Sequence, residues 1–198
     1  MQQLKRPRQN LFAGVVAGVL AFSVGYFLTR HMVQMGTVPS TEVEAGESIV
    51  AGWFFYNAHH VPLAESLSAF GETMTASGYD LLDMDSTSEY LDFLYVIPPL
   101  ILFIFGVLAA ASEGKTRSIS LAFVNGASIV VGYLIAVIIG LVIFAESITT
   151  MGVTGTLRPD IIQSLIIAGV VYPVIFGGIG GVAYFLSQGS IKIQSYGP

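Results

Sequence analysis

Residues 161–186 read IIQSLIIAGVVYPVIFGGIGGVAYFL and contain no Asp, Glu, Lys or Arg. The uncharged run around them is 31 residues long, and a membrane-spanning helix needs only about 20 mainly apolar residues. Three further uncharged runs occur, with 21 residues after Arg8, 20 after Asp92 and 28 after Arg117. Backbone groups in lipid are satisfied only in helices or closed barrels, and these runs lack the alternating pattern of barrel strands.

The runs predict an all-α membrane protein with four transmembrane helices, at 11–29, 88–112, 119–145 and 161–186. The expected connections are a basic cytoplasmic N-terminus (1–10), an acidic, partly helical extracytoplasmic loop subdomain (30–87), a cytoplasmic turn (113–118), an outer loop (146–160) and a cytoplasmic tail (187–198).

Composition agrees with a membrane protein and removes several classes of function. The chain is 54% hydrophobic and 11% charged, whereas soluble domains carry about 25% charged residues. There is no cysteine, which excludes disulfides, thiolate catalysis and Cys-ligated zinc. The net charge is −5, so the basic face needed for nucleic-acid binding is missing. No Walker loop, dinucleotide fingerprint or Ser-His-Asp arrangement is found, so we expect no enzyme and no cofactor.

The distribution of basic residues predicts the orientation. Lys and Arg are retained on the cytoplasmic side, and four spans place the N-terminus, the 113–118 turn and the C-terminal tail on one side. These segments hold six of the eight basic residues, which are Lys5, Arg6, Arg8, Lys115, Arg117 and Lys192. We therefore expect a multi-pass protein of the cell membrane with both termini in the cytoplasm; a viral envelope membrane fits the same pattern. The first apolar stretch exceeds a typical signal peptide core, which favours an uncleaved anchor.

The long outer loop is strongly acidic. From His31 to Asp92 there are ten acidic residues and no Lys or Arg, and the whole chain has three lysines. One interpretation is a surface adapted to high salt, where dense carboxylates are screened and stay hydrated. The alternative is a vestibule that collects cations.

The aromatic stretch Gly52-Trp53-Phe54-Phe55-Tyr56-Asn57-Ala58-His59-His60-Val61 resembles segments of uncharacterised four-helix membrane proteins of halophilic archaea. That group has no known activity, so the resemblance implies a type of organism and no chemistry. Aromatic side chains gather where membrane meets water. We interpret 47–56 as an interfacial or re-entrant helix with an anchor made of Trp53, Phe54, Phe55 and Tyr56, and a buried strand or loop as the alternative.

Two further patterns in the loop predict helices. Leu63, Leu67, Phe70 and Met74 follow Pro62 with the spacing of one amphipathic stripe. This stripe either packs on the aromatic segment or forms a groove for a partner. Ser86 and Glu89 have capping-box spacing and mark the start of the second spanning helix.

Prolines are expected to bend two of the spans. Pro98 and Pro99 lie early in the second span and Pro173 lies within the fourth. A proline inside a helix removes a hydrogen bond and kinks the helix. Such a kink is either a gating hinge or a bend that neighbouring helices tolerate.

Polar residues offer few candidate sites. His31, His59 and His60 lie near many carboxylates, and imidazole with carboxylate can bind zinc or copper. Adjacent histidines without a third ligand at helical spacing are a weak signal, so we predict no metal. Within the spans, Asn125, Ser128, Gln163 and Ser164 are the main polar residues, and we expect interhelical hydrogen bonds from them.

Small residues give the main packing signal in the spans. Gly14 and Gly18, and again Gly177 and Gly181, have the four-residue spacing that lets helix backbones approach closely. These pairs pack within one bundle or between subunits. A Leu at Ala168 should matter less than one at these glycines if Ala168 faces lipid.

We expect a non-catalytic structural or accessory subunit of a membrane assembly. Its partners are the lipid bilayer and a second copy or another membrane protein. The alternatives are a small channel or facilitator with a cation-collecting vestibule, and an outer-side metal-binding protein.

Overall fold

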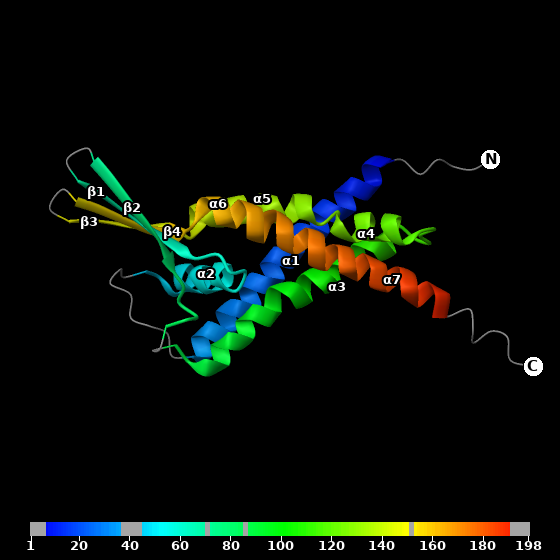
Figure 1. The fold of residues 1–198 in the computed structure, drawn as a ribbon, viewed down its shortest axis with the longest axis horizontal. Coiled ribbons are helices and arrows are strands. Elements are labelled where there is room, and N and C mark those ends of the chain that lie inside the picture. Colours follow the sequence, from blue (N-terminus) through cyan, green and yellow to red (C-terminus); the bar gives the residue numbers. More distant parts are fainter. Residues whose placement is uncertain (1–6, 37–44, 70–71, 85–86, 151–152, 191–198) are drawn as a thin grey trace, which may run out of the picture. The chain divides into compact units, whose positions relative to one another are not determined.

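The fold contains four long apolar helical stretches. The computed structural model describes residues 7–36, 45–69, 72–84, 87–150 and 153–190, and its elements are shown in Figure 1. Among the described residues, four stretches are long and apolar enough to cross a membrane, which agrees with the four long apolar helices that the uncharged runs predict. They are Phe12–Met35, Glu89–Ser112, Ile119–Ile143 and Ile161–Gln188.

Three of the four stretches depart from a single regular helix. The first stretch is one helix, whereas the second begins as a 3₁₀ helix and the third is interrupted at Ser128 and Ile129. The fourth contains two π-helical segments. In chain order the helices are α1 Pro7–Met35, η1 Glu89–Val96, α3 Ile97–Ser112, α4 Ile119–Ala127, α5 Val130–Ile143, α6 Ile161–Gln163, η2 Ser164–Val171, η3 Pro173–Gly177 and α7 Gly178–Ser190.

The chain divides into two compact units, each built from separate segments. The described residues of the first unit are 7–22, 99–136 and 169–190. Those of the second unit are 23–36, 45–69, 72–84, 87–98, 137–150 and 153–168.

The first unit is held by close approaches of helix backbones at glycines. A Cβ on Gly181 would fall on the carbonyl oxygen of Ala122 in α4, and one on Gly180 would fall on that of Phe103 in α3. A Cβ on Gly18 would similarly fall on the carbonyl oxygen of Ile129. Only glycine leaves room for these contacts, so the glycine-rich start of α7 lies against two helices at once.

Gly181→Leu is expected to destabilise the protein by roughly 1–3 kcal/mol, because the new side chain must separate α7 from α4. The matched control is Ser187→Leu, which adds the same side chain at an exposed position of α7. Thermal unfolding in detergent compares the two variants. Equal melting temperatures would show that the α4–α7 contact does not hold the unit together.

Ala168 does not face lipid. Its side chain is 1% exposed, so it cannot serve as the lipid-facing comparison for the glycines. The spacing pattern did not separate this buried position from exposed neighbours such as Ile166, which is 56% exposed.

The second unit contains a four-stranded antiparallel sheet, so the all-α prediction is wrong for this part. The strand order is β2-β1-β4-β3, with the hairpin β1–β2 from the long loop beside the hairpin β3–β4 from the second loop (Figure 1). The strands are β1 Leu63–Ala69, β2 Glu72–Tyr79, β3 Glu146–Thr150 and β4 Val153–Pro159. The predicted outer loop 146–160 is therefore mostly strand.

The predicted amphipathic helix after Pro62 is also a hairpin. Leu67 pairs with Met74 across β1 and β2, whereas the stripe placed them on one helix face; Phe70 lies outside the described residues. A spacing of four residues, as between Leu63 and Leu67, fits one face of a strand as well as one face of a helix. The Ser and Thr residues that alternate with these apolar ones favour the strand.

The helix boundaries correct several smaller expectations. α1 continues to Met35, six residues beyond the predicted end, and α7 extends to Ser190. η1 begins at Glu89 with Ser88 as its N-cap residue, without a capping bond from the side chain. Ser86 lies outside the described residues.

Two of the three prolines lie in the first turn of a helix. Pro98 and Pro99 are the second and third residues of α3, directly after η1. Proline is tolerated in a first helical turn, where its missing N–H has no helical partner. Pro173 instead begins η3, within the π-helical part of the fourth stretch.

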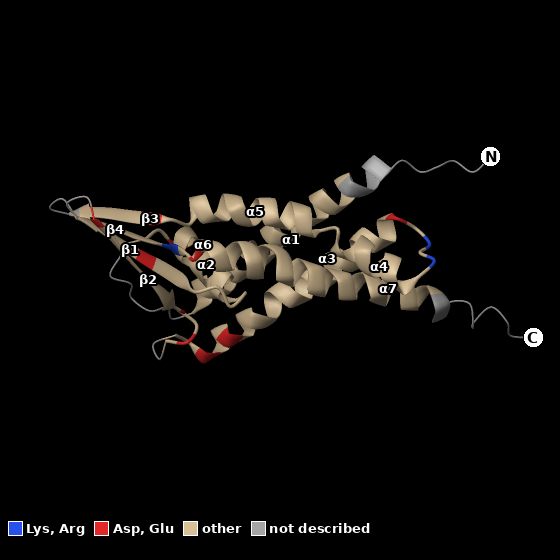
Figure 2. Cartoon of the chain, turned by 45° about the horizontal axis from the view of Figure 1, so that its top comes forward, with Lys and Arg blue, Asp and Glu red and all other residues tan. Residues whose placement is uncertain are grey.

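Carboxylates concentrate in the second unit. Among the described residues, nine Asp and Glu lie in this unit and only Glu113 lies in the first. The first unit holds Lys115 and Arg117 in the turn between α3 and α4, where Figure 2 shows blue segments.

Candidate functional site

The aromatic segment forms helix α2, Glu47–Asn57, which is buried in the second unit. All residues from Ala51 to Asn57 are buried, and Trp53 and Phe54 are 0% exposed. A helix that is apolar on every side belongs in a protein interior. The helix is present as expected, but its aromatic side chains lie inside the protein and not at a lipid-facing interface.

Hydrogen bonds attach α2 to the end of α5. The Trp53 indole N–H donates to the Phe144 carbonyl at 2.8 Å, and the Tyr56 hydroxyl donates to the Val137 carbonyl at 2.6 Å. Burial raises the pKa of the Tyr56 hydroxyl far above its usual value, so this group stays a donor. Buried aromatic groups with polar tips need such partners, and here both partners are backbone carbonyls.

Aromatic rings fill the space around α2. The Tyr26 ring stacks on Phe144 with centroids 5.2 Å apart, and it meets Phe55 edge-on at 6.4 Å. The Tyr26 hydroxyl donates to the Ser48 carbonyl at 3.0 Å. The second half of α1 is thereby joined to α2.

Helix α2 ends in a Schellman motif in which His60 takes the left-handed position. Val61 N–H donates to the Tyr56 carbonyl at 3.1 Å and His60 N–H to the Asn57 carbonyl at 2.7 Å. The φ of His60 is +56°, a conformation usually taken by glycine at this point. The turn is fixed further by Asn57, whose side chain donates to the Val61 carbonyl and accepts from Leu81 N–H.

His59 is a buried titratable group. It is 1% exposed, and its Nδ1 lies 2.7 Å from the Phe55 carbonyl, which requires a proton on Nδ1. Burial lowers the pKa of His59 to about 4, against a smaller opposing effect of that hydrogen bond. The imidazole is therefore neutral at neutral pH.

His60 belongs to a half-exposed polar cluster. Its ring stacks on Tyr95 at 4.7 Å, and the Tyr95 hydroxyl donates to Asp83 at 3.4 Å. Burial raises the pKa of the Asp80 carboxyl, and the Leu82 N–H that donates to it at 3.0 Å lowers that pKa in part.

The structure does not bring the three histidines together as a metal site. His59 faces a backbone carbonyl, His60 stacks on an aromatic ring, and His31 is exposed on α1. Within the described ranges, no group of three or more His, Asp or Glu side chains is placed to hold a metal ion.

The polar residues of the spans make local contacts. Ser128 donates to the Asn125 carbonyl at 2.6 Å. Gln163 N–H donates at 2.9 Å to Asp160, which caps α6. The buried hydroxyls of Ser164 and Thr29 have no hydrogen-bond partner among the described residues.

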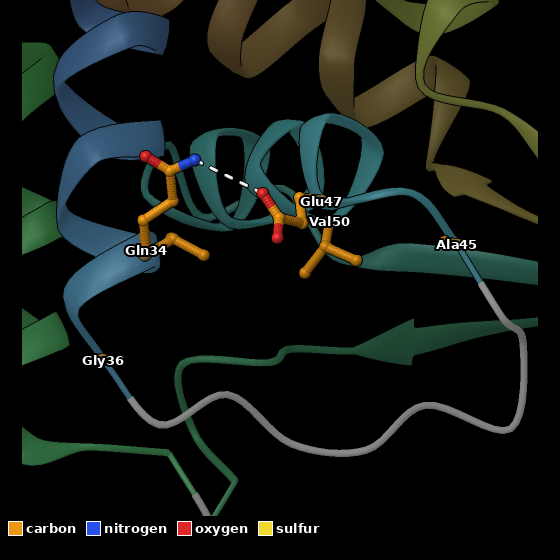
Figure 3. A pocket seen from close by; sticks show the side chains of 6 residues that line it. Gln34, Gly36, Ala45, Glu47 and Val50 are labelled. Carbon is orange, nitrogen blue, oxygen red and sulfur yellow. Dashed lines mark hydrogen bonds between the residues drawn. The ribbon is translucent and has the colours of Figure 1, made fainter.

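A pocket of about 500 Å³ lies between the end of α1 and the start of α2 (Figure 3). Gln34 donates to Glu47 across it at 3.3 Å. The remaining lining residues are Val33, Gly36, Ala45 and Val50. One hydrogen bond and mostly aliphatic walls define no reaction chemistry.

Sequence reasoning missed the roles of Asn57 and of the sheet. The signal for Asn57 was its position at the end of an apolar helix, where an amide can close a turn. The signal for the sheet was the alternation of Ser and Thr with apolar residues in both loops.

The comparisons with known proteins give one match. No curated protein matches the chain, and no solved structure matches it. The model of a family of unknown function, DUF7978, matches residues 1–188. The chain therefore belongs to this family of unknown function.

Proposed function

We propose that this protein is a non-catalytic structural or accessory subunit of a membrane assembly. The observation that supports it is the sheet of the second unit, which has exposed side chains on both faces and is attached to helices apolar enough to span a membrane. Every described residue of β2 is exposed. An exposed sheet with open edge strands can pair with or pack against other proteins.

Purification of the full chain in a mild detergent, followed by native mass spectrometry, tests the proposal. The expected result is a complex with a partner protein in fixed stoichiometry. A chain that purifies alone as a monomer from its native membrane would contradict it.

The acidity of the second unit favours a channel or facilitator as the second candidate. Nine described carboxylates would raise the local cation concentration near a pore. Cation flux into proteoliposomes that contain only this protein would support a channel over an accessory subunit.

The expected topology has both termini in the cytoplasm, because six of eight basic residues then lie on that side. A reporter fused to either terminus should be cytoplasmic, and one inserted beside Ser77 should be on the outer side. An external signal from a terminal fusion would reverse the assignment.

The acidic surface is expected to need salt. We propose that it is a halophilic adaptation, in which molar salt screens repulsion among the carboxylates of the second unit. Thermal stability of the purified protein should therefore fall as salt is lowered from molar to dilute. An unchanged melting temperature across this range would argue against the adaptation.

A further inference from the structure

The sheet has two chemically different faces. Side chains alternate between the faces of a strand, and the register places hydroxyls from all four strands on one face. Neighbouring hydroxyls on this face pair at 2.8–2.9 Å. The residues are Ser66, Ser68, Thr73, Thr75, Ser147, Thr149, Thr154 and Thr156.

The opposite face is apolar and open. Its central row runs from Met74 through Leu67 and Gly155 to Ile148. Met74 is 77% exposed, Leu67 47% and Ile148 38%, so the described residues leave this row uncovered. Gly155 adds no side chain to the row, and a Cβ there would make only an ordinary contact with the Leu67 side chain at 3.5 Å.

Carboxylates of one sign flank the apolar row. Glu65 and Glu146 lie on this face, each two residues before the apolar residue of its strand, Leu67 or Ile148. Glu72 lies on the same face, two residues before Met74. The only basic residue of the sheet, Arg158, has Ala64 as its partner and so belongs to the opposite face. The apolar face is therefore flanked by negative charge alone.

We infer that this face, called here the Met74 face, binds a segment of another protein that presents apolar side chains flanked by Lys or Arg. The inference rests on the proposed accessory role and names the surface and the chemistry of the partner. Apolar side chains of the segment cover Met74, Leu67 and Ile148. Its basic groups pair with Glu65, Glu72 and Glu146, so contact is favoured by both burial and charge.

A second copy fits this face poorly. Two copies face to face would bring six carboxylates together, and like charges across an interface are unfavourable. The strands have seven, eight, five and seven residues, and at about 3.3 Å per residue and about 4.8 Å between strands they cover roughly 430 Å². This area is well below the approximately 800 Å² per partner of a stable interface. An area of this size suits a peptide segment.

Lipid is also an unsuitable occupant of the Met74 face. Carboxylates are costly in the hydrocarbon region, and the edge strands β2 and β3 have unpaired backbone groups that lipid cannot satisfy.

Site-specific photo-crosslinking in native membranes tests the inference. A photo-reactive amino acid replaces Met74 in the full chain, and the matched control places it at Thr75 on the hydroxyl face. The Met74 position should crosslink to another protein, through a segment with apolar residues and Lys or Arg, several-fold more than Thr75 does. Glu72→Lys with Glu146→Lys should reduce that yield several-fold, and reversal of the partner's basic residues should restore it. Trp53 emission reports whether each variant is folded.

Each other outcome overturns the inference. Crosslinks to a second copy, to lipid, to a segment without basic residues, or to nothing exclude the proposed segment. If a complex still purifies in fixed stoichiometry while Met74 gives no such crosslink, the accessory role stands. The assignment of the partner-binding surface to the Met74 face is then wrong. If the protein purifies alone, the accessory role itself fails.

Discussion

Trp53→Ala is expected to lower the free energy of unfolding by about 3–5 kcal/mol, the usual cost of truncating a buried Trp. The indole is fully buried and donates to the Phe144 carbonyl. Its removal leaves a cavity between α2 and the end of α5 and an unpaired buried carbonyl. Unfolding followed by far-ultraviolet circular dichroism measures the effect, since the variant has no tryptophan.

Two further variants separate the contributions. Trp53→Phe keeps most of the volume but loses the donor, so its expected cost is about 1–3 kcal/mol. Phe27→Ala removes an aromatic ring that is 61% exposed on α1 and should cost much less. If Trp53→Ala and Phe27→Ala unfold alike, α2 does not hold the second unit together.

Acid is expected to destabilise the second unit through His59. Its pKa in the folded protein is about 4, below the ordinary value of 6.5, so the folded state favours the neutral imidazole. This contribution is complete above pH 6.5 and is lost as the pH falls toward 4. The shift corresponds to about 3 kcal/mol at most. The emission of Trp53, the single tryptophan of the chain, follows the transition in the same helix.

The control for this loss is His59→Asn, whose amide N–H can replace the Nδ1 donor without titrating. Carboxylates titrate in both proteins, so the difference between their pH profiles isolates His59. The variant should lose less stability than the wild type between pH 6.5 and 4. Parallel profiles would show that His59 becomes charged without cost and is not buried in solution.

The four long apolar helical stretches could be predicted because absence of charge over 20 residues has few structural explanations. The pairing of the two hairpins into one sheet could not, because β1 pairs with β4 across 84 to 96 residues, from Ala69 with Val153 to Leu63 with Pro159. Nothing local in either hairpin specifies that partner. The apolar spacing from Leu63 to Met74 also fitted a helix, so periodicity alone favoured the wrong element.

The burial of the aromatic segment 47–57 also could not be predicted from the sequence. Trp and Tyr at a membrane surface and Trp and Tyr in a protein core have the same sequence signature, since both need an apolar surrounding and one polar contact. The deciding partner of Trp53 is a carbonyl 91 residues further along the chain. The helix could be predicted from residues 47–57, whereas its burial depends on α5.

Synthesis order has a consequence for the sheet. β1 and β2 emerge from the ribosome well before β4, because Ala69 and its partner Val153 are about 84 residues apart. At about 5–20 residues per second, the first hairpin waits roughly 4–17 s for its neighbour. During that interval the β1 edge that later pairs with β4 has no strand beside it, and an open strand edge can pair with other chains. Slower synthesis therefore lengthens the time for which this one edge of the sheet is exposed.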